Sequence, residues 1–216
     1  MTDVWSSRAE AFRESPTHRE GPDLDLVVEM CEPGAGVKVL DVATGGGHVA
    51  RRLREEGCTV VTVDPAPGMK PDVIARAEHL PFDDGSFDVV TCRIAAHHFE
   101  NIRDAVNEMV RVSNRLLVIE DNLYRGEQAE EAERLRDPSH VRCYTEEEWR
   151  EFVTDAGFEV EQLEHFPRRQ SFKAWLERVD TPPDAAARIR ELLADRIDGD
   201  LLNFESIVLK ARRSQK

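Results

Sequence analysis

Hydrophobic positions along the chain follow two spacings, which predict strands that alternate with helices. Continuous apolar runs of the kind found in buried parallel strands occur at 37–42, 59–63, 87–92 and 116–119. Apolar residues at helical spacing lie before and between these runs, at 24–32, 49–56 and 103–112. Because strands and helices alternate, we expect a mostly parallel, doubly wound α/β sheet.

The segments before residue 24 and after residue 119 depart from this alternation. Residues 3–14 predict a short, semi-detached helix, and 126–137 predict a highly charged helix that we expect to be a solvated face or a lid. Thr145 and Glu148 have capping-box spacing at the start of a cleaner helix, 145–156. The remaining elements are predicted strands at 158–166 and 204–209 and predicted helices at 171–178 and 183–196.

Three consecutive glycines join the first predicted strand to the next helix, in the stretch 39–50, VLDVATGGGHVA. Glycine allows a positive φ and a close approach between the backbone and a ligand, and the N-terminus of a helix offers unpaired N–H groups. The stretch therefore predicts a site for a nucleotide-like cofactor, although a glycine-rich turn without a ligand would have the same composition.

Two registers of this stretch favour different cofactors. Gly45, Gly47 and Ala50 match the dinucleotide spacing GxGxxA. Asp64 follows Gly45 by 19 residues, near the ~20 expected of an acid that binds ribose. In the other register, Asp41 precedes a ladder of small residues, and its carboxylate suits the ammonium group of a zwitterionic cofactor. The turn alone leaves both cofactors open.

Length, charge and cysteine content narrow the class of protein. The 216 residues suit one domain over 1–216, and no apolar run approaches the ~20 residues of a membrane helix. The N-terminus lacks a signal-like apolar core, and the four cysteines form no CxxC pair, so we expect a cytoplasmic protein without disulfides, membrane insertion or a metal site. The net charge of −14 argues against a nucleic-acid partner and favours a small-molecule substrate.

Later segments resemble a known family. The stretch 77–90, AEHLPFDDGSFDVV, is similar to the motif after the third strand of class I S-adenosylmethionine-dependent methyltransferases, specifically the ubiquinone/menaquinone-biosynthesis-like (type 11) group. VLDVATGGGHVA at 39–50, VTVDPAPGM at 61–69 and CRIAAHHFEN at 92–101 resemble other motifs of that family in the same order. The resemblance covers 37–120 and continues more loosely to the end of the chain.

This resemblance implies both a fold and a reaction. We expect a Rossmann-like sheet of seven strands with the last one antiparallel, an N-terminal cap helix within 1–20 and a lid at 122–143. The implied reaction transfers a methyl group from S-adenosylmethionine, which becomes S-adenosylhomocysteine, to an unidentified small molecule. An NAD(P)-dependent oxidoreductase and a noncatalytic S-adenosylmethionine-binding protein are the alternatives, and the oligomeric state stays open.

The resemblance also assigns cofactor contacts around the glycine turn. Ala43, Gly45 and Gly47 would let the backbone approach the methionyl part of the cofactor. Asp41 would order the loop and help to balance the ammonium charge. Asp64, at the end of the second strand, would accept hydrogen bonds from both ribose hydroxyls.

Further implied contacts lie at the adenine and methionine ends of the cofactor. Ala77, through its N–H, and Glu78 would flank the adenine edge, while Met69 or Ala66 would pack against the ring. Arg93 would present its backbone carbonyl to the ammonium. Many relatives have Gly-Asp where this chain has residues 75–76, Ala-Arg, which puts a side-chain hydrogen bond to the adenine amino group in doubt.

Candidate residues for chemistry and for substrate contact come from outside the glycine turn. His97 and His98 follow the strand that carries a cofactor contact, and an imidazole is the natural general base near neutral pH, so either could remove a proton from the methyl acceptor. The cap and the charged region supply further candidates for substrate contact or closure of the site: Phe12, His18, His140, Arg142 and Tyr144.

Overall fold

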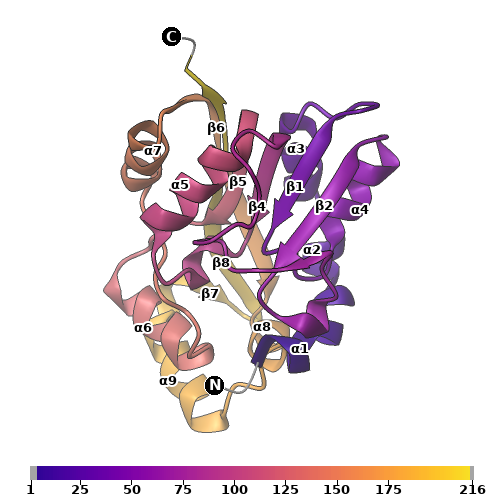
Figure 1. Ribbon diagram of the computed structural model, residues 1–216. Helices are drawn as coiled ribbons and strands as arrows, with labels where there is room; N and C mark the ends of the chain where they lie inside the picture. Colours follow the sequence, from indigo (N-terminus) through magenta and orange to yellow (C-terminus); the bar gives the residue numbers. More distant parts are fainter. Residues whose placement is uncertain (1–3, 215–216) are drawn as a thin grey trace.

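A mixed sheet with the strand order β3-β2-β1-β4-β5-β8-β6 forms the centre of the computed structural model, which describes residues 4–214 except for the Thr17 side chain (Figure 1). Its strands are β1 (Lys38–Val42), β2 (Thr59–Asp64), β3 (Val73–Ile74), β4 (Phe87–Arg93), β5 (Ser113–Asn122), β6 (Phe158–Ser171) and β8 (Leu201–Arg213). Strands β1 to β5 run parallel, and β8 runs antiparallel to β5 and β6. The predicted doubly wound sheet with an antiparallel last strand is confirmed, and a two-residue strand, β7 (Ile197–Asp198), pairs with β8 beside it.

Helices cover both faces of this sheet, because successive residues of a strand point to opposite sides. Val39 of β1 belongs to the core beneath one pair of helices, whereas Leu40 belongs to the core beneath the other pair. The pairs are α3 (Pro22–Met30) with α4 (His48–Glu55), and α5 (Ile102–Val112) with α7 (Glu146–Asp155). The predicted capping box of α7 is present, since Thr145 and Glu148 exchange side-chain and backbone hydrogen bonds.

The other α-helices gather at the end of the sheet where the parallel strands finish (Figure 1). They are α1 (Val4–Arg13), α2 (Pro16–Arg19), α6 (Glu127–Arg136), α8 (Phe172–Glu177) and α9 (Pro183–Leu192). Residues 1–3 of the predicted cap lie outside the described residues. None of the described helices is long and apolar enough to cross a membrane.

The charged helix, predicted to be a solvated face or a lid, is solvated on one side only, because its other side is buried. Helix α6 packs against α9, α8 and β8 in an apolar cluster that includes Ala132 and Ile189. Glu130 and Glu133 on α6 are buried, at 3% and 7% exposure. Charged residues can be buried in this way when they are paired, and Glu133 lies 2.7 Å from Arg125.

Strands β6 and β8 extend well beyond the predicted segments, and they form an antiparallel ladder from Phe158 and Arg213 to Ser171 and Leu201, with one shift of register between Val160 and Gln162. The extensions escaped prediction because charged residues such as Arg168 interrupt their apolar alternation. Between β2 and β3 the chain makes only a short 3-10 turn, η1 (Pro67–Met69), as the prolines predict.

Candidate active site

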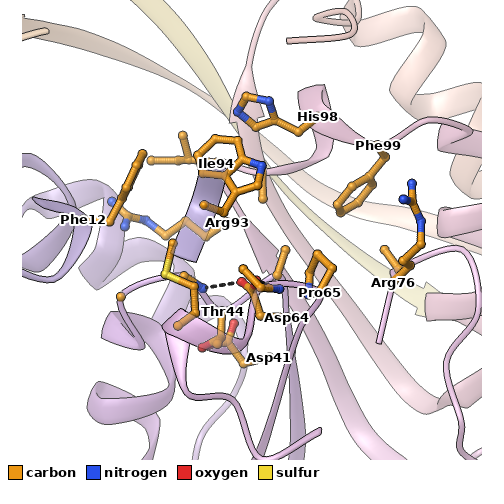
Figure 2. A pocket seen from close by; sticks show the side chains of 18 of the residues that line it. Phe12, Asp41, Thr44, Asp64, Pro65, Arg76, Arg93, Ile94, His98 and Phe99 are labelled. Atoms are coloured by element: carbon orange, nitrogen blue, oxygen red, sulfur yellow. Dashed lines mark hydrogen bonds between the residues drawn. The ribbon is translucent and has the colours of Figure 1, made fainter. Parts of the chain in front are cut away.

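A cavity of about 530 Å³ lies beyond the carboxyl ends of β1, β2 and β4, with α1 against it (Figure 2). The strand order reverses at this point, since β2 and β3 continue on one side of β1 and the other strands on its far side. Ligands of open α/β sheets bind at such a switch point. Figure 2 shows Asp64 near the middle of the cavity, Phe12 on one side of it, and Arg76 and Phe99 on the other.

The glycine turn forms the floor of the cavity. Ala43 and Gly45 both have positive φ, 53° and 51°, and Gly47 begins α4 with φ 75°. Thr44 Oγ1 donates a 2.6 Å hydrogen bond to Asp41 Oδ2. Burial raises the pKa of Asp41 to about 6. Asp41 therefore orders the loop, as predicted, but the sequence did not show that Thr44 is its partner.

Asp64 ties the glycine turn to the loop after β2. Its Oδ2 accepts a hydrogen bond from the Gly45 N–H at 3.0 Å, and its Oδ1 accepts one from the Ala66 N–H at 2.9 Å. A carboxylate has lone pairs left after two such bonds, so Asp64 can also accept from ligand hydroxyls in the cavity. Ala66 and Met69 line the same wall and pack with Ala9 of α1.

Glu78 and Ala77 line the end of the cavity near Arg76, as the adenine assignment requires. Glu78 Oε1 accepts a hydrogen bond from the Glu100 N–H at 2.9 Å, and Arg76 Nε lies 3.4 Å from Glu78 Oε2. Burial alone would raise the pKa of Glu78, but backbone N–H donors and Arg76 lower it overall. A lowered pKa keeps Glu78 ionised at neutral pH, where it acts only as a hydrogen-bond acceptor.

Arg93 has a structural role that the sequence did not reveal. Its guanidinium lies 2.6 Å from Glu120 and 2.5 Å from Asp23. Arg168 lies 2.7 Å and 3.0 Å from the same two carboxylates. This network of two arginines and two acids joins α3, β4, β5 and β6, whose residues are far apart in the sequence.

Ile94, the next residue, adopts the left-handed region with φ 53° at the cavity wall. A β-branched residue is strained there, at a free-energy cost of about 1–3 kcal/mol, and such strain clusters at functional sites. The Ile94 N–H donates a 2.7 Å hydrogen bond to the backbone carbonyl of Glu120, which holds the strained residue in place.

The two predicted catalytic histidines occupy different places. His98 lines the main cavity, and its Nδ1 lies 3.1 Å from the Ser139 backbone oxygen. Desolvation, and then the neighbouring His97, lower the pKa of His98 well below its usual range. His97 lies behind it, with Nδ1 2.5 Å from Asp121 Oδ1; burial would lower its pKa, but Asp121 raises it overall.

The N-terminal cap reaches the cavity through Phe12 and His18, as predicted, and through Trp5, which sequence reasoning missed. His48, also missed, places its Nε2 3.1 Å from the Phe12 carbonyl. A Cβ on Gly46 would lie 2.5 Å from His48 Nε2 and 3.1 Å from the Phe12 carbonyl oxygen, so a side chain there would displace the His48 ring from its contact with the cap. The sequence could have pointed to His48, because it is the first residue of the helix that follows the glycine turn.

Three predicted substrate contacts, His140, Arg142 and Tyr144, do not line the cavity. Arg142 lies at the surface, 2.8 Å from Glu148, and Tyr144 packs against the aromatic residues of α7. Ser139 and Val141 of the same segment line the cavity instead. Ser139 lies in the turn after α6, and the N–H groups of Val141 and Arg142 both donate to the His97 carbonyl, which holds this irregular segment beside the site.

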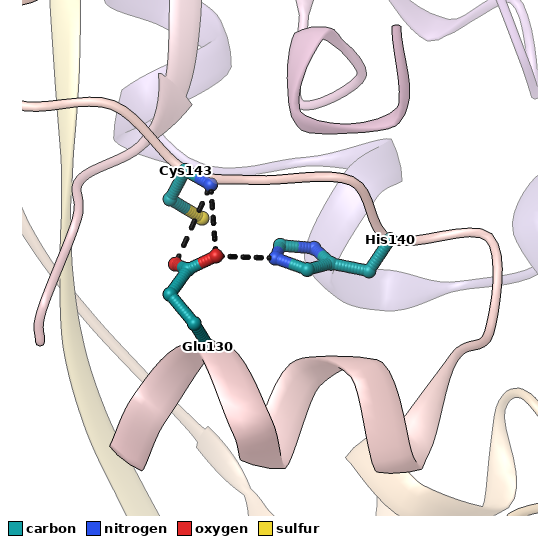
Figure 3. Close-up of side chains that lie close together, drawn as sticks. All are labelled: Glu130, His140 and Cys143. Atoms are coloured by element: carbon teal, nitrogen blue, oxygen red, sulfur yellow. Dashed lines mark hydrogen bonds and ion pairs between the residues drawn. The ribbon is translucent and has the colours of Figure 1, made fainter. Parts of the chain in front are cut away.

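His140 belongs to a buried group with Glu130 and Cys143 (Figure 3). One ligand-type atom from each residue lies within 4.8 Å of the others, so the group could hold a metal ion. In this structure, however, the Glu130 carboxylate accepts hydrogen bonds from the Cys143 N–H and lies 2.9 Å from His140 Nε2. These contacts fasten the segment after α6 to that helix.

The sheet order, the glycine turn and the acid at the end of β2 are together typical of class I methyltransferases. Residues 40–115 match the family model described as a methyltransferase domain. YcgJ of Bacillus subtilis (strain 168), an uncharacterized methyltransferase, is 31% identical over 207 residues, which cover 86% of this chain and 82% of YcgJ. The solved structure of BH2331 from Bacillus halodurans C-125 is 31% identical, with a TM-score of 0.80, over 90% of this chain and 100% of that one.

The chain therefore belongs to the class I S-adenosylmethionine-dependent methyltransferases. A demethylmenaquinone methyltransferase of Thermus thermophilus is 34% identical over 116 residues, which cover 45% of this chain and 51% of that protein. This relationship agrees with the resemblance to the ubiquinone/menaquinone-like group. Membership in this family leaves the oxidoreductase alternative without support, because that alternative rested on the GxGxxA spacing alone.

The chemistry of the cavity fits S-adenosylmethionine better than a dinucleotide. A pyrophosphate needs N–H donors and cations, but the cavity presents the carboxylates of Asp41, Asp64 and Glu78. Carboxylates suit an ammonium group and hydroxyls. The cations at its wall, Arg76 and Arg93, are already paired with acids.

Proposed function

We propose that this methyltransferase acts on a small-molecule acceptor and that His98 is its general base. The observation that carries the proposal is the position of His98 in the wall of a cavity of about 530 Å³, a size typical of small-ligand sites. The net charge of −14 supports a small molecule over a nucleic acid.

The cofactor would lie along the glycine turn. Asp41 and the backbone of Ala43 and Gly45 would hold its amino-acid end, Asp64 its ribose, and Ala77 with Glu78 its adenine edge. Bound S-adenosylmethionine supplies a methyl group already activated by the sulfonium. The chain then has to align the methyl acceptor for in-line attack and remove its proton.

His98 is prepared to take that proton. A carbonyl oxygen can only accept a hydrogen bond, so the contact with Ser139 places the His98 proton on Nδ1 and leaves the Nε2 lone pair available. The lowered pKa keeps the ring unprotonated at neutral pH. His97, held by Asp121, lies with its ring centroid 4.2 Å from that of His98 and positions it.

We further propose that the protein works in the cytoplasm. All four cysteines are buried free thiols. Thiols persist in the reducing conditions of that compartment, whereas disulfides are typical of secreted proteins.

Replacement of His98 tests the proposed chemistry. For methyl acceptors with an acidic O–H or N–H, we expect His98→Asn to lower kcat by ~10²- to 10⁴-fold, because general-base catalysis is lost. Affinity for S-adenosylhomocysteine, measured by titration calorimetry, should be unchanged. His79→Asn is the matched control, because His79 is exposed and does not line the cavity.

The assay uses radiolabelled S-adenosylmethionine with a panel of phenols, amines, thiols and carboxylic acids. Equal turnover by wild type and His98→Asn would contradict the role of His98. Cofactor binding without methylation of any panel member would favour the noncatalytic alternative instead.

A further inference from the structure

A second, smaller cavity of about 50 Å³ adjoins the main one. The residues common to both cavities are Trp5, Phe12, His18, Ile94 and His98. Its other walls come from α6, β5, β6, β8 and the end of α8, together with His97. The small cavity therefore lies next to His98 on the side away from the predicted cofactor contacts.

The ionic groups that line this small cavity include more cations than anions. Arg136, Arg168 and Arg178 line it, together with the two carboxylates of Glu133 and Asp137. The whole chain has the opposite balance, with a net charge of −14. A local excess of positive over negative groups favours an anionic ligand over a cationic one.

Acids and aromatic rings hold two of these arginines in place, since Arg168 pairs with Asp23 and Glu120, and Arg136 lies 3.6 Å from Glu133. The Arg136 guanidinium lies 4.5 Å from the ring centroid of Trp175, and that of Arg168 lies 5.6 Å from Phe204. Arg178 donates a 3.3 Å hydrogen bond to the Gln170 side-chain oxygen. A guanidinium carries five N–H donors in a planar fork, so arginines held by such contacts suit bidentate recognition of an oxyanion.

The surroundings of Arg178 are a further observation. Burial, and then the neighbouring guanidinium groups of Arg136 and Arg168, lower the pKa of Arg178 to about 10. An anionic group beside Arg178 would offset both effects, because it favours the charged form of the guanidinium.

We propose that the small cavity binds a carboxylate or phosphate group of the methyl acceptor, with Arg178 as the principal cation. The volume of about 50 Å³ suits a small oxyanion, since one water needs ~10–15 Å³. The apolar body of the acceptor then lies among Trp5, Phe12 and Ile94, with its reactive atom beside His98. This substrate class rests on the proposed function, because it assumes that the acceptor lies next to His98.

Binding of small probes to the full chain tests the proposal. The probes are 4-hydroxybenzoate, 4-hydroxyphenyl phosphate and the neutral 4-hydroxybenzamide, each measured with and without saturating S-adenosylhomocysteine. Trp5 and Trp175 line the cavity, so tryptophan fluorescence reports binding. We expect at least one anion to bind about tenfold or more tightly than the amide, because charge-assisted hydrogen bonds are the stronger ones. The two anions distinguish a carboxylate site from a phosphate site.

Variants of Arg178 test whether the small cavity causes the preference for anionic probes. Arg178→Met should remove the preference for anions and leave the affinity for S-adenosylhomocysteine unchanged, while Arg178→Lys should keep part of the preference because it keeps the charge. Arg188→Met is the matched control, since Arg188 is exposed on α9 and pairs with Glu131 at 3.1 Å.

Three results would overturn the proposal: equal binding of the amide and both anions, an unchanged preference in Arg178→Met, or no binding of any probe at millimolar concentration. Failure of wild type to bind S-adenosylhomocysteine would be a separate result, which contradicts the proposed function itself. Because the probes are also measured without that ligand, the two failures are distinguishable.

Discussion

The proposed cofactor side of the active site presents mainly carboxylates, whereas the proposed acceptor side presents three guanidinium groups, two carboxylates and aromatic rings. Asp41 and Asp64 line the first side. Arg136, Arg168 and Arg178 line the second. An acidic chain thus arranges opposite local charges within one site, and this separation suits a cationic cofactor on one side and an anionic substrate on the other.

The two sides also differ in how they are held. The backbone N–H groups of Gly45 and Ala66 hold the carboxylate of Asp64 in place. Ion pairs between distant elements fix the other side, above all through Arg93, Asp23 and Glu120. Changes on the cofactor side should therefore affect mainly binding, whereas changes to the ion pairs should affect mainly folding.

The largest expected effect is on stability, from Arg93→Met. The substitution leaves Asp23 and Glu120 buried with one guanidinium fewer between them. Breaking a buried ion pair costs about 3–5 kcal/mol, so the free energy of unfolding in urea should fall by about that amount.

Arg103→Met is the control for this prediction, because Arg103 also pairs with two acids, Glu151 and Asp155, but at the surface. Its unfolding midpoint should stay close to that of wild type. Equal unfolding midpoints for Arg93→Met and Arg103→Met would mean that the buried ion pairs do not stabilise the fold.

A smaller effect is expected from pH. Desolvation lowers the pKa of His18 and of His98 well below the usual range, so both are neutral when folded and gain a proton on unfolding below about pH 6.5. Their contribution to stability is present above that pH and is lost as pH falls, by at most about 1.4 kcal/mol per pH unit for each histidine. His97, whose pKa is raised, contributes in the opposite direction, with stability lost as pH rises.

Urea unfolding between pH 7 and pH 5 measures this difference. The loss of stability of wild type over this range should be steeper than that of His18→Asn, which removes one of the two protons taken up. Parallel curves for the two proteins would mean that His18 is not held neutral in the folded state.

The residues of the proposed cofactor side could be placed from the sequence because they follow strand ends and a local turn. Asp41, Gly45 and Asp64 are fixed by short-range patterns, and the structure brings them together. The confirmed sheet order follows from the same alternation of strands and helices.

The acceptor side could not be predicted in this way, since its residues come from distant segments. No local pattern joins Trp5 to Arg178, or shows that Ser139 and Val141 face the cavity while Arg142 faces solvent. The burial of α6 was missed for a related reason, because the apolar residues that it packs against, such as Ile189 of α9, lie far along the chain.

Titration of wild type and Asp64→Ala with S-adenosylhomocysteine tests most directly the claim that the acidic side holds the cofactor. We predict that wild type binds and that Asp64→Ala binds more weakly by about 1–3 kcal/mol, roughly 5- to 150-fold, because ribose hydroxyls lose their partner. Asp72→Ala is the matched control, because Asp72 also accepts a backbone hydrogen bond, from Thr62, but lies outside the cavity. Equal affinity in Asp64→Ala and wild type would contradict the account.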